Sequence, residues 1–197
     1  MDKLLFSFQG GGVCWDSSST SQATCRLPLS IQQPYGIYDN TNVLNNFSDY
    51  TIVHILYCSG DLHIGDVTRN YSYNGNTVIQ SGYNNTLATI RWVLGQIGNN
   101  TTGQLSPIFS KLVILGSSAG SLAAQLWSDY LLNTFKYESA AVISDSFVGV
   151  LPDYQGTKKK MSFHSFVIKL NFDQYNYYYF YPQGLLLKIL VYVIIEN

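Results

Sequence analysis

The chain has 197 residues, a net charge of −1 and only 12% charged residues. A chain of this length can bury the core of one domain. The near-neutral charge argues against a nucleic-acid partner, because binding to phosphates calls for a basic face.

An apolar strand is predicted at residues 4–9 (Leu-Leu-Phe-Ser-Phe-Gln), directly before three consecutive glycines at residues 10–12. A glycine loop at such a strand end can offer backbone N–H groups to a negatively charged oxygen. Three glycines can also form a simple flexible turn between two elements. A serine motif farther along the chain favours the first interpretation.

Cys14 and Cys25 follow the glycines and enclose a loop rich in serine and threonine. A disulfide between them would brace this loop, and disulfides are typical of proteins outside the cytosol. Sequons for N-glycosylation point to the same compartment, although an asparagine-rich chain also contains sequons by chance. They lie at Asn46, Asn70, Asn84, Asn99 and Asn100. No Cys–His spacing indicates a zinc site, and we expect neither a metal nor another cofactor.

A second strand is predicted at residues 50–57, which are rich in β-branched side chains. We interpret His54, inside this strand, as a hydrogen-bonded core histidine. Asp61 and His63 lie in the following loop, in the position where open α/β sheets bind ligands. These two residues either belong to the rim of a site or fix the loop by hydrogen bonding.

Apolar side chains at helical spacing predict an amphipathic helix at residues 85–98. A buried strand is then predicted at residues 111–115, a helix at residues 119–135 and another strand at residues 140–144. This alternation of strands and helices predicts an α/β fold with a parallel sheet.

The segment between the third strand and its helix, residues 116–120 (Gly-Ser-Ser-Ala-Gly), matches the pattern G-x-S-x-G. Between a buried strand and a helix, this pattern is typical of a nucleophile elbow, which lifts the serine Oγ above the sheet. Ser118 is therefore the candidate catalytic nucleophile. Acyl transfer develops negative charge on a carbonyl oxygen, and backbone N–H groups stabilise it. The candidate oxyanion-hole donors are Gly11, Gly12 and Ala119.

Four segments in this order resemble the pectin acetylesterase/Notum family of serine esterases: residues 10–15 with Cys25-Arg26, residues 56–65, residues 116–120 and residues 143–146. The resemblance extends over residues 4–152. It implies an α/β-hydrolase-like fold and ester hydrolysis without a metal, with Ser118 as the nucleophile and the oxyanion hole named above. It implies an acetylated polysaccharide such as pectin, or another ester, as substrate, and it implies no obligate protein partner. It places Asp145 near the site at a strand end, and it implies a partner for Cys58 upstream of Met1. The alternative for Cys58 is a buried free thiol.

Two departures from the family pattern bear on activity. Family members are longer at both ends, so we expect a domain truncated at both ends. In this fold the nucleophile is followed by an acid and then by a histidine. Asp145 or Asp153 with His164 satisfies this order, but the spacing is wrong for a triad that returns over two further strands. The alternative function is a catalytically inactive remnant or binding module that lacks the triad acid and histidine.

The character of the sequence changes near Gly156. We expect a partial esterase domain over residues 1–156 and a non-homologous tail over residues 157–197, disordered or produced by a misread intron or frameshift. The apolar run at residues 185–195 contains Lys188 and is too short for a membrane span. The first residues lack the apolar core of a signal peptide. A secreted or lumenal location is therefore implied by the resemblance to the family.

Overall fold

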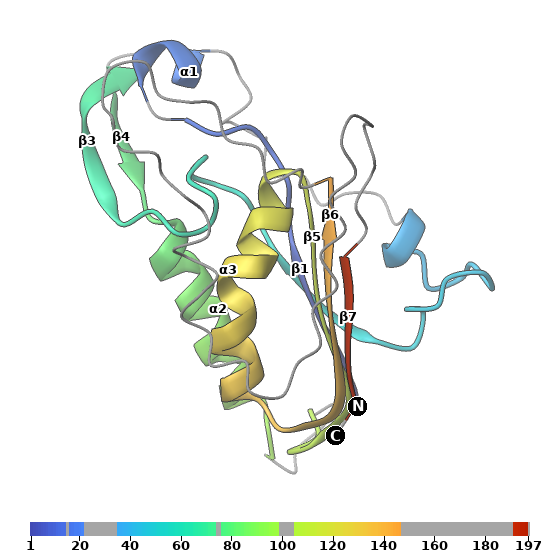
Figure 1. The fold of residues 1–197 in the computed structure, drawn as a ribbon. Helices are drawn as coiled ribbons and strands as arrows, with labels where there is room; N and C mark the ends of the chain where they lie inside the picture. The colour runs from blue at the N-terminus through green and yellow to red at the C-terminus, as the bar shows by residue number, and fades with distance from the viewer. Residues whose placement is uncertain (15, 22–34, 74–75, 99–104, 147–190, 197) are drawn as a thin grey trace, which may run out of the picture.

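The computed structural model describes residues 1–14, 16–21, 35–73, 76–98, 105–146 and 191–196. Its main sheet has five strands in the order β2–β1–β5–β6–β7. Four of them run parallel: β1 (Lys3–Phe8), β2 (Thr51–Ile55), β5 (Phe109–Ser117) and β6 (Tyr137–Asp145). β7 (Val191–Glu196) pairs antiparallel with β6. The predicted α/β fold with a mostly parallel sheet is thus confirmed (Figure 1).

Two long helices, α2 (Gly82–Gly95) and α3 (Ala119–Thr134), lie on one face of the main sheet (Figure 1). The smaller elements are α1 (Ser17–Ser21), the 3-10 helix η1 (Gly36–Tyr38), and an antiparallel hairpin of β3 (Val67–Tyr73) and β4 (Asn76–Gln80). No helix within the described ranges is long and apolar enough to cross a membrane. Of the tail expected at residues 157–197, only β7 lies within the described residues.

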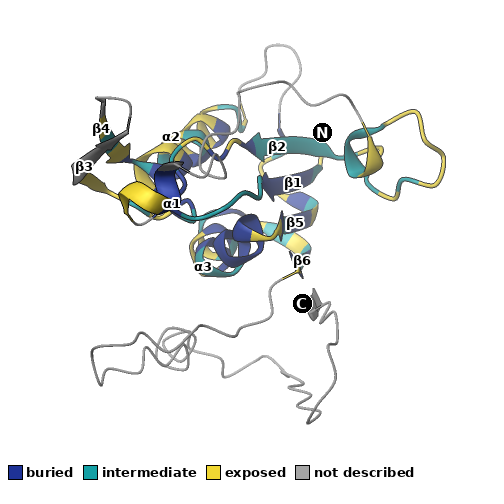
Figure 2. Ribbon diagram, turned by 90° about the horizontal axis from the view of Figure 1, so that it is seen from above, coloured by how far each residue is buried: buried dark blue, intermediate teal, exposed yellow. Residues whose placement is uncertain are grey.

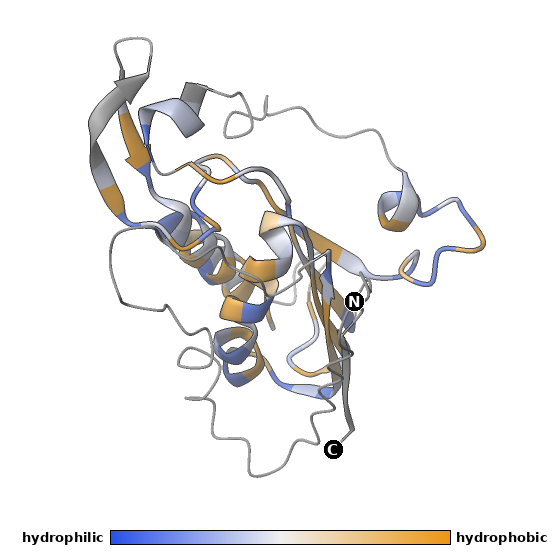
Figure 3. Cartoon of the chain, turned by 45° about the horizontal axis from the view of Figure 1, so that its top comes forward, coloured by the Kyte–Doolittle hydropathy of each residue, from blue (hydrophilic) through white to orange (hydrophobic). Residues whose placement is uncertain are grey.

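The hydrophobic core lies between the sheet and these two helices. Alternate residues of β1 point to the same face, so Leu4, Phe6 and Phe8 pack in one cluster with side chains of β5, α2 and α3. Buried residues follow β1, β5 and the side of α3 that faces them (Figure 2), and many residues of the same elements are hydrophobic (Figure 3). Leu5 and Ser7, on the other face of β1, are also buried. Burial on both faces is typical of a central parallel strand.

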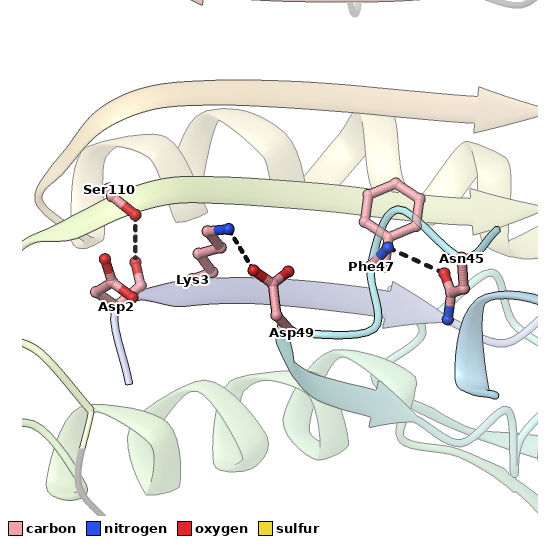
Figure 4. A network of polar contacts seen from close by, with 6 residues as sticks. All are labelled: Asp2, Lys3, Asn45, Phe47, Asp49 and Ser110. Carbon is pink, nitrogen blue, oxygen red and sulfur yellow. Dashed lines mark hydrogen bonds and ion pairs between the residues drawn. The ribbon is translucent and has the colours of Figure 1, made fainter. Parts of the chain in front are cut away.

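Polar contacts connect the amino ends of the parallel strands (Figure 4). Lys3 of β1 forms an ion pair with Asp49, which lies just before β2. The Ser110 hydroxyl of β5 donates a hydrogen bond to the carbonyl oxygen of Asp2 at 3.2 Å. These contacts connect the three strands at their amino ends, and the loops at the opposite, carboxyl ends of the strands carry the predicted site.

Candidate active site

Four loops leave the main sheet at the carboxyl ends of its parallel strands. The glycine loop (residues 10–12) follows β1, the segment at residues 56–65 follows β2, Ser118 follows β5, and Ser146 follows β6. The carboxyl ends of parallel strands are where α/β proteins bind ligands. The residues singled out from the sequence as site residues lie in these loops, at the strand ends or, for Ala119, at the start of α3.

Ser118 has the backbone conformation of a nucleophile elbow. Its φ is 54° and its ψ is −122°, between the last residue of β5 and the first residue of α3. A non-glycine residue with such a positive φ costs about 1–3 kcal/mol and persists only where its surroundings hold it. Here the Ser118 N–H donates a hydrogen bond to the carbonyl oxygen of Asp145, at 3.0 Å. The side chain of Ser118 lies at an exposed position.

The two glycines of the elbow are required by close backbone contacts. A Cβ atom on Gly116 would lie 1.9 Å from the carbonyl oxygen of Gly120. A Cβ atom on Gly120 would lie 2.1 Å from the carbonyl oxygen of Phe8, at the end of β1. The first turn of α3 therefore packs directly on the backbone of both neighbouring strands, and no larger residue fits at either position.

The glycine loop runs against the elbow. A Cβ atom on Gly10 would lie 2.5 Å from the carbonyl oxygen of Ser117. Ala119 is the first residue of α3, where backbone N–H groups have no partner within the helix and the helix dipole is positive. Among the described residues, no backbone hydrogen bond uses the N–H groups of Gly11, Gly12 or Ala119. The role of these three groups as oxyanion donors stays a prediction.

Asp61 and His63 are buried, with 7% and 2% of their surface exposed. The Asp61 carboxylate accepts hydrogen bonds from the N–H of Gly82 at 2.7 Å and of His63 at 3.2 Å. The His63 Nε2–H donates to the carbonyl oxygen of Gln9 at 2.9 Å. Of the two interpretations of these residues, this placement fits the one in which they fix the loop, because neither side chain reaches the surface as a rim residue would.

Burial lowers the pKa of His63, although its hydrogen bond to the Gln9 carbonyl and the nearby Asp61 carboxylate favour the charged form. The lowered pKa favours the neutral form of the ring. Because a carbonyl oxygen only accepts hydrogen bonds, the proton of this neutral ring lies on Nε2.

Asp145 lies beside Ser118 at the carboxyl end of β6, exposed to solvent. Its backbone carbonyl holds the Ser118 N–H, and its carboxylate accepts a hydrogen bond from the Ser146 hydroxyl at 3.0 Å. Asp145 therefore contacts the elbow through its main chain and leaves its carboxylate at the surface of the site.

Sequence reasoning missed a chain of buried polar groups behind the elbow. The Ser121 hydroxyl donates to the carbonyl oxygen of Ser118 at 2.5 Å, and the Ser144 hydroxyl donates to the carbonyl oxygen of Ser121 at 3.0 Å. The Gln125 amide donates to the Ser144 hydroxyl at 2.7 Å. This network fixes the first turns of α3 on β6. No local pattern indicates it, because it depends on how the side chain of Ser144 in β6 meets α3 in space.

The described histidines do not hydrogen-bond to the Ser118 hydroxyl. His63 binds Gln9, and His54 Nδ1 lies 3.0 Å from the Tyr38 hydroxyl. His54 is half-buried, and its Nε2 is buried without a hydrogen-bond partner in the described part of the chain. The prediction of a hydrogen-bonded core histidine therefore holds for Nδ1 and not for Nε2. Burial lowers its pKa. His164 and Asp153 lie outside the described residues.

Cys14 is buried at the end of the glycine loop, and its N–H donates to the carbonyl oxygen of Gly60 at 2.8 Å. Its predicted partner, Cys25, lies outside the described residues. Cys58 is an exposed free thiol. Within the described ranges, no group of three or more His, Cys, Asp or Glu side chains could hold a metal ion.

A serine on a strand-to-helix elbow beside a glycine loop, at the carboxyl edge of a parallel sheet, is typical of serine hydrolases of the α/β class. The chain belongs to the pectinacetylesterase family, whose model matches residues 1–178. The family predicted from the sequence is thereby confirmed. The match crosses the domain boundary expected at residue 156.

The structure is also similar to that of the Wnt deacylase Notum from Drosophila, with a TM-score of 0.49 and 18% sequence identity. The similarity covers 74% of this chain and 44% of Notum, so the matched part spans less than half of that protein. No curated protein sequence matches the chain.

Proposed function

We propose that this chain carries the nucleophile and the oxyanion hole of a carboxylic-ester hydrolase that removes acetyl groups from a polysaccharide such as pectin. The observation that carries this proposal is the elbow conformation of Ser118, which a hydrogen bond to the Asp145 carbonyl holds. Ser118 is exposed at the carboxyl end of the central strand β5. Membership of the pectinacetylesterase family supports an acetylated substrate.

In the proposed reaction, the Ser118 Oγ attacks the acyl carbon and a histidine takes its proton. The negative charge that develops on the carbonyl oxygen is stabilised by the N–H groups of Gly11, Gly12 and Ala119. The bond to the sugar oxygen then breaks, and the sugar leaves as an alcohol after it receives the proton. Water attacks the acetyl-serine, releases acetate and restores the hydroxyl.

A fluorophosphonate probe tests the nucleophile directly, because it reacts covalently with activated serines. We expect labelling of the purified full chain at Ser118, mapped by mass spectrometry. Labelling should be lost in Ser118→Ala and retained in Ser117→Ala, whose hydroxyl is also exposed and lies one residue away. A folded sample without labelling would contradict the proposal and favour an inactive remnant or binding module.

The substrate is tested by acetate release. We expect hydrolysis of p-nitrophenyl acetate and release of acetate from acetylated pectin, both lost in Ser118→Ala. Hydrolysis of the small ester without release from pectin or another acetylated polysaccharide would contradict the polysaccharide substrate while preserving the esterase.

We also propose that the protein functions outside the cytosol. The sequon asparagines Asn46 and Asn84 are at exposed positions, and a disulfide between Cys14 and Cys25 would brace the glycine loop. Expression through a secretory pathway should give a product whose mass falls on deglycosylation and whose Cys14 is unreactive before reduction. A fully reduced, unglycosylated product would contradict this location.

A further inference from the structure

His63 holds the peptide that leads into the glycine loop. Its Nε2–H donates to the carbonyl oxygen of Gln9 at 2.9 Å, and the same peptide carries the N–H of Gly10. In a planar trans peptide the C=O and N–H groups point in opposite directions, so fixing one fixes the other. The orientation of the backbone just before Gly11 and Gly12, two of the candidate oxyanion donors, is thereby set by His63.

The imidazole ring is itself fixed from two sides. It stacks on the Tyr57 ring at a centroid distance of 4.7 Å and meets the Phe8 ring edge-on at 5.3 Å. Tyr57 also binds Gln9, because its backbone N–H donates to the Gln9 side-chain oxygen at 2.8 Å. Gln9 is therefore held through its main chain by His63 and through its side chain by Tyr57, two residues of one loop whose rings stack on each other.

The backbone of His63 connects this loop to both long helices. Its carbonyl oxygen accepts hydrogen bonds from the Trp127 indole N–H of α3 at 3.0 Å and from the Thr86 hydroxyl of α2 at 3.4 Å. Leu62 and His63 both have a φ of 60°. Two consecutive non-glycine residues in the left-handed region are uncommon and are maintained only by specific surroundings.

We propose that His63 is a positioning residue of the esterase site, which sets the backbone of the oxyanion loop relative to the helix that begins after Ser118. This inference rests on the proposed function of Ser118. His63 touches neither the substrate nor Ser118 and acts through Gln9. The carbonyl oxygen of Gln9 needs a hydrogen-bond donor on the side chain at position 63. The N–H group at Nε2 is therefore the essential feature of His63, and its aromatic ring is not.

Two variants of the full chain separate the donor from the ring. His63→Phe keeps an aromatic ring for stacking on Tyr57 and removes the N–H, whereas His63→Gln removes the ring and can place an amide N–H near the position of Nε2. We expect His63→Phe to shift the backbone amide resonances of residues 10–12 and to slow fluorophosphonate labelling of Ser118 by roughly ten- to hundred-fold. His63→Gln should restore most of both. The matched control, His54→Gln, should change neither, because His54 contacts Tyr38 rather than the glycine loop.

Wild-type amide shifts and labelling rate in His63→Phe would overturn the inference, and so would equal losses in both variants. If His63→Phe does not fold, two other measurements test the inference: the imidazole ¹⁵N spectrum of the wild type and the backbone amide shifts of His63→Gln. A ring protonated at Nδ1 instead of Nε2 overturns the inference. If the wild type is not labelled at all, the proposed function fails, and the amide shifts of residues 10–12 still test the positioning contact separately.

Discussion

The carboxylate of Asp61 accepts a hydrogen bond from the backbone N–H of Gly82 at 2.7 Å, across 21 positions of the sequence. Gly82 is the first residue of α2, and the preceding Ser81 makes no capping hydrogen bond with its side chain. Asp61 therefore caps the helix from a distant loop, and its negative charge is favourable at the positive end of the helix dipole. The same carboxylate accepts the His63 N–H, so one buried side chain fixes both the loop and the helix.

Asp61→Asn should destabilise the protein. Asparagine offers one carbonyl oxygen in place of two carboxylate oxygens, and its NH₂ group would face one of the two backbone N–H donors. One buried N–H would lose its partner, which costs about 1–3 kcal/mol in free energy of unfolding. Urea denaturation followed by circular dichroism measures this loss.

Asp66→Asn is the matched control, since Asp66 lies between β2 and β3 like Asp61, is exposed, and accepts a hydrogen bond from the Asn84 amide at 2.7 Å. Its free energy of unfolding should change by no more than about 0.5 kcal/mol. Equal effects of the two substitutions would show that Asp61 is not a cap.

Gly120→Ala should lower the free energy of unfolding by roughly 1–3 kcal/mol, because its Cβ atom would overlap the Phe8 carbonyl oxygen and separate α3 from β1. Gly95→Ala is the helical control, since a Cβ atom there meets nothing within 4 Å. The control should stabilise the protein by up to about 1 kcal/mol, because alanine has the higher helix propensity. Both changes can be measured by urea denaturation, and a stable Gly120→Ala variant would contradict the close packing.

The strands and the elbow could be predicted because their signals are local. The apolar run at residues 4–9 coincides with β1 except for its last residue, and the run at residues 111–115 lies within β5. The G-x-S-x-G pattern lies at the turn from β5 into α3. The start of α2 could not be predicted in this way. The helix was expected from Asn85 and begins at Gly82, because Asp61 supplies the cap from another part of the chain.

The roles of buried polar residues at the site were equally hidden. Serine and threonine in a helix have no strong pattern of their own, and their effect depends on partners from other elements. Ser121 and Thr86 therefore gave no signal in the sequence, although each is buried and hydrogen-bonded behind the site loops. The hairpin of β3 and β4 was also missed, because its residues alternate only weakly between apolar and polar.

Tyr38→Phe should destabilise the contact between η1 and the sheet. The Tyr38 hydroxyl lies 2.5 Å from the Ser7 hydroxyl and 3.0 Å from His54 Nδ1, and Ser7 is 1% exposed. Removing it leaves the buried Ser7 hydroxyl with only the longer contact to His54 at 3.3 Å, so we expect a loss of about 1–2 kcal/mol in thermal or urea denaturation. Tyr130→Phe, at a position 44% exposed, is the control and should change stability little. An unaffected Tyr38→Phe variant would contradict the cluster.

Acid should destabilise the protein before its carboxylates titrate. Burial lowers the pKa of both His63 and His54 below the ordinary value of 6.5. Between the folded-state and unfolded-state pKa values the unfolded chain binds more protons, so the free energy of unfolding falls as the pH falls below about 6.5. Well above that pH the histidines are neutral in the unfolded chain as well, and the slope from them disappears. Urea denaturation at intervals from about pH 7.5 to about pH 5 measures the effect above the range of ordinary carboxyl groups.

The variant His63→Gln separates this effect from that of other titrating groups, because it removes one buried imidazole and retains a hydrogen-bond donor. It should lose less stability than the wild type over the same pH interval, with His54 responsible for part of the remaining slope. The pKa of His63 can be followed in parallel by the ¹⁵N shifts of its ring. Stability that increases on acidification, or an unchanged slope in His63→Gln, would show that His63 is not the buried neutral imidazole that holds the Gln9 carbonyl.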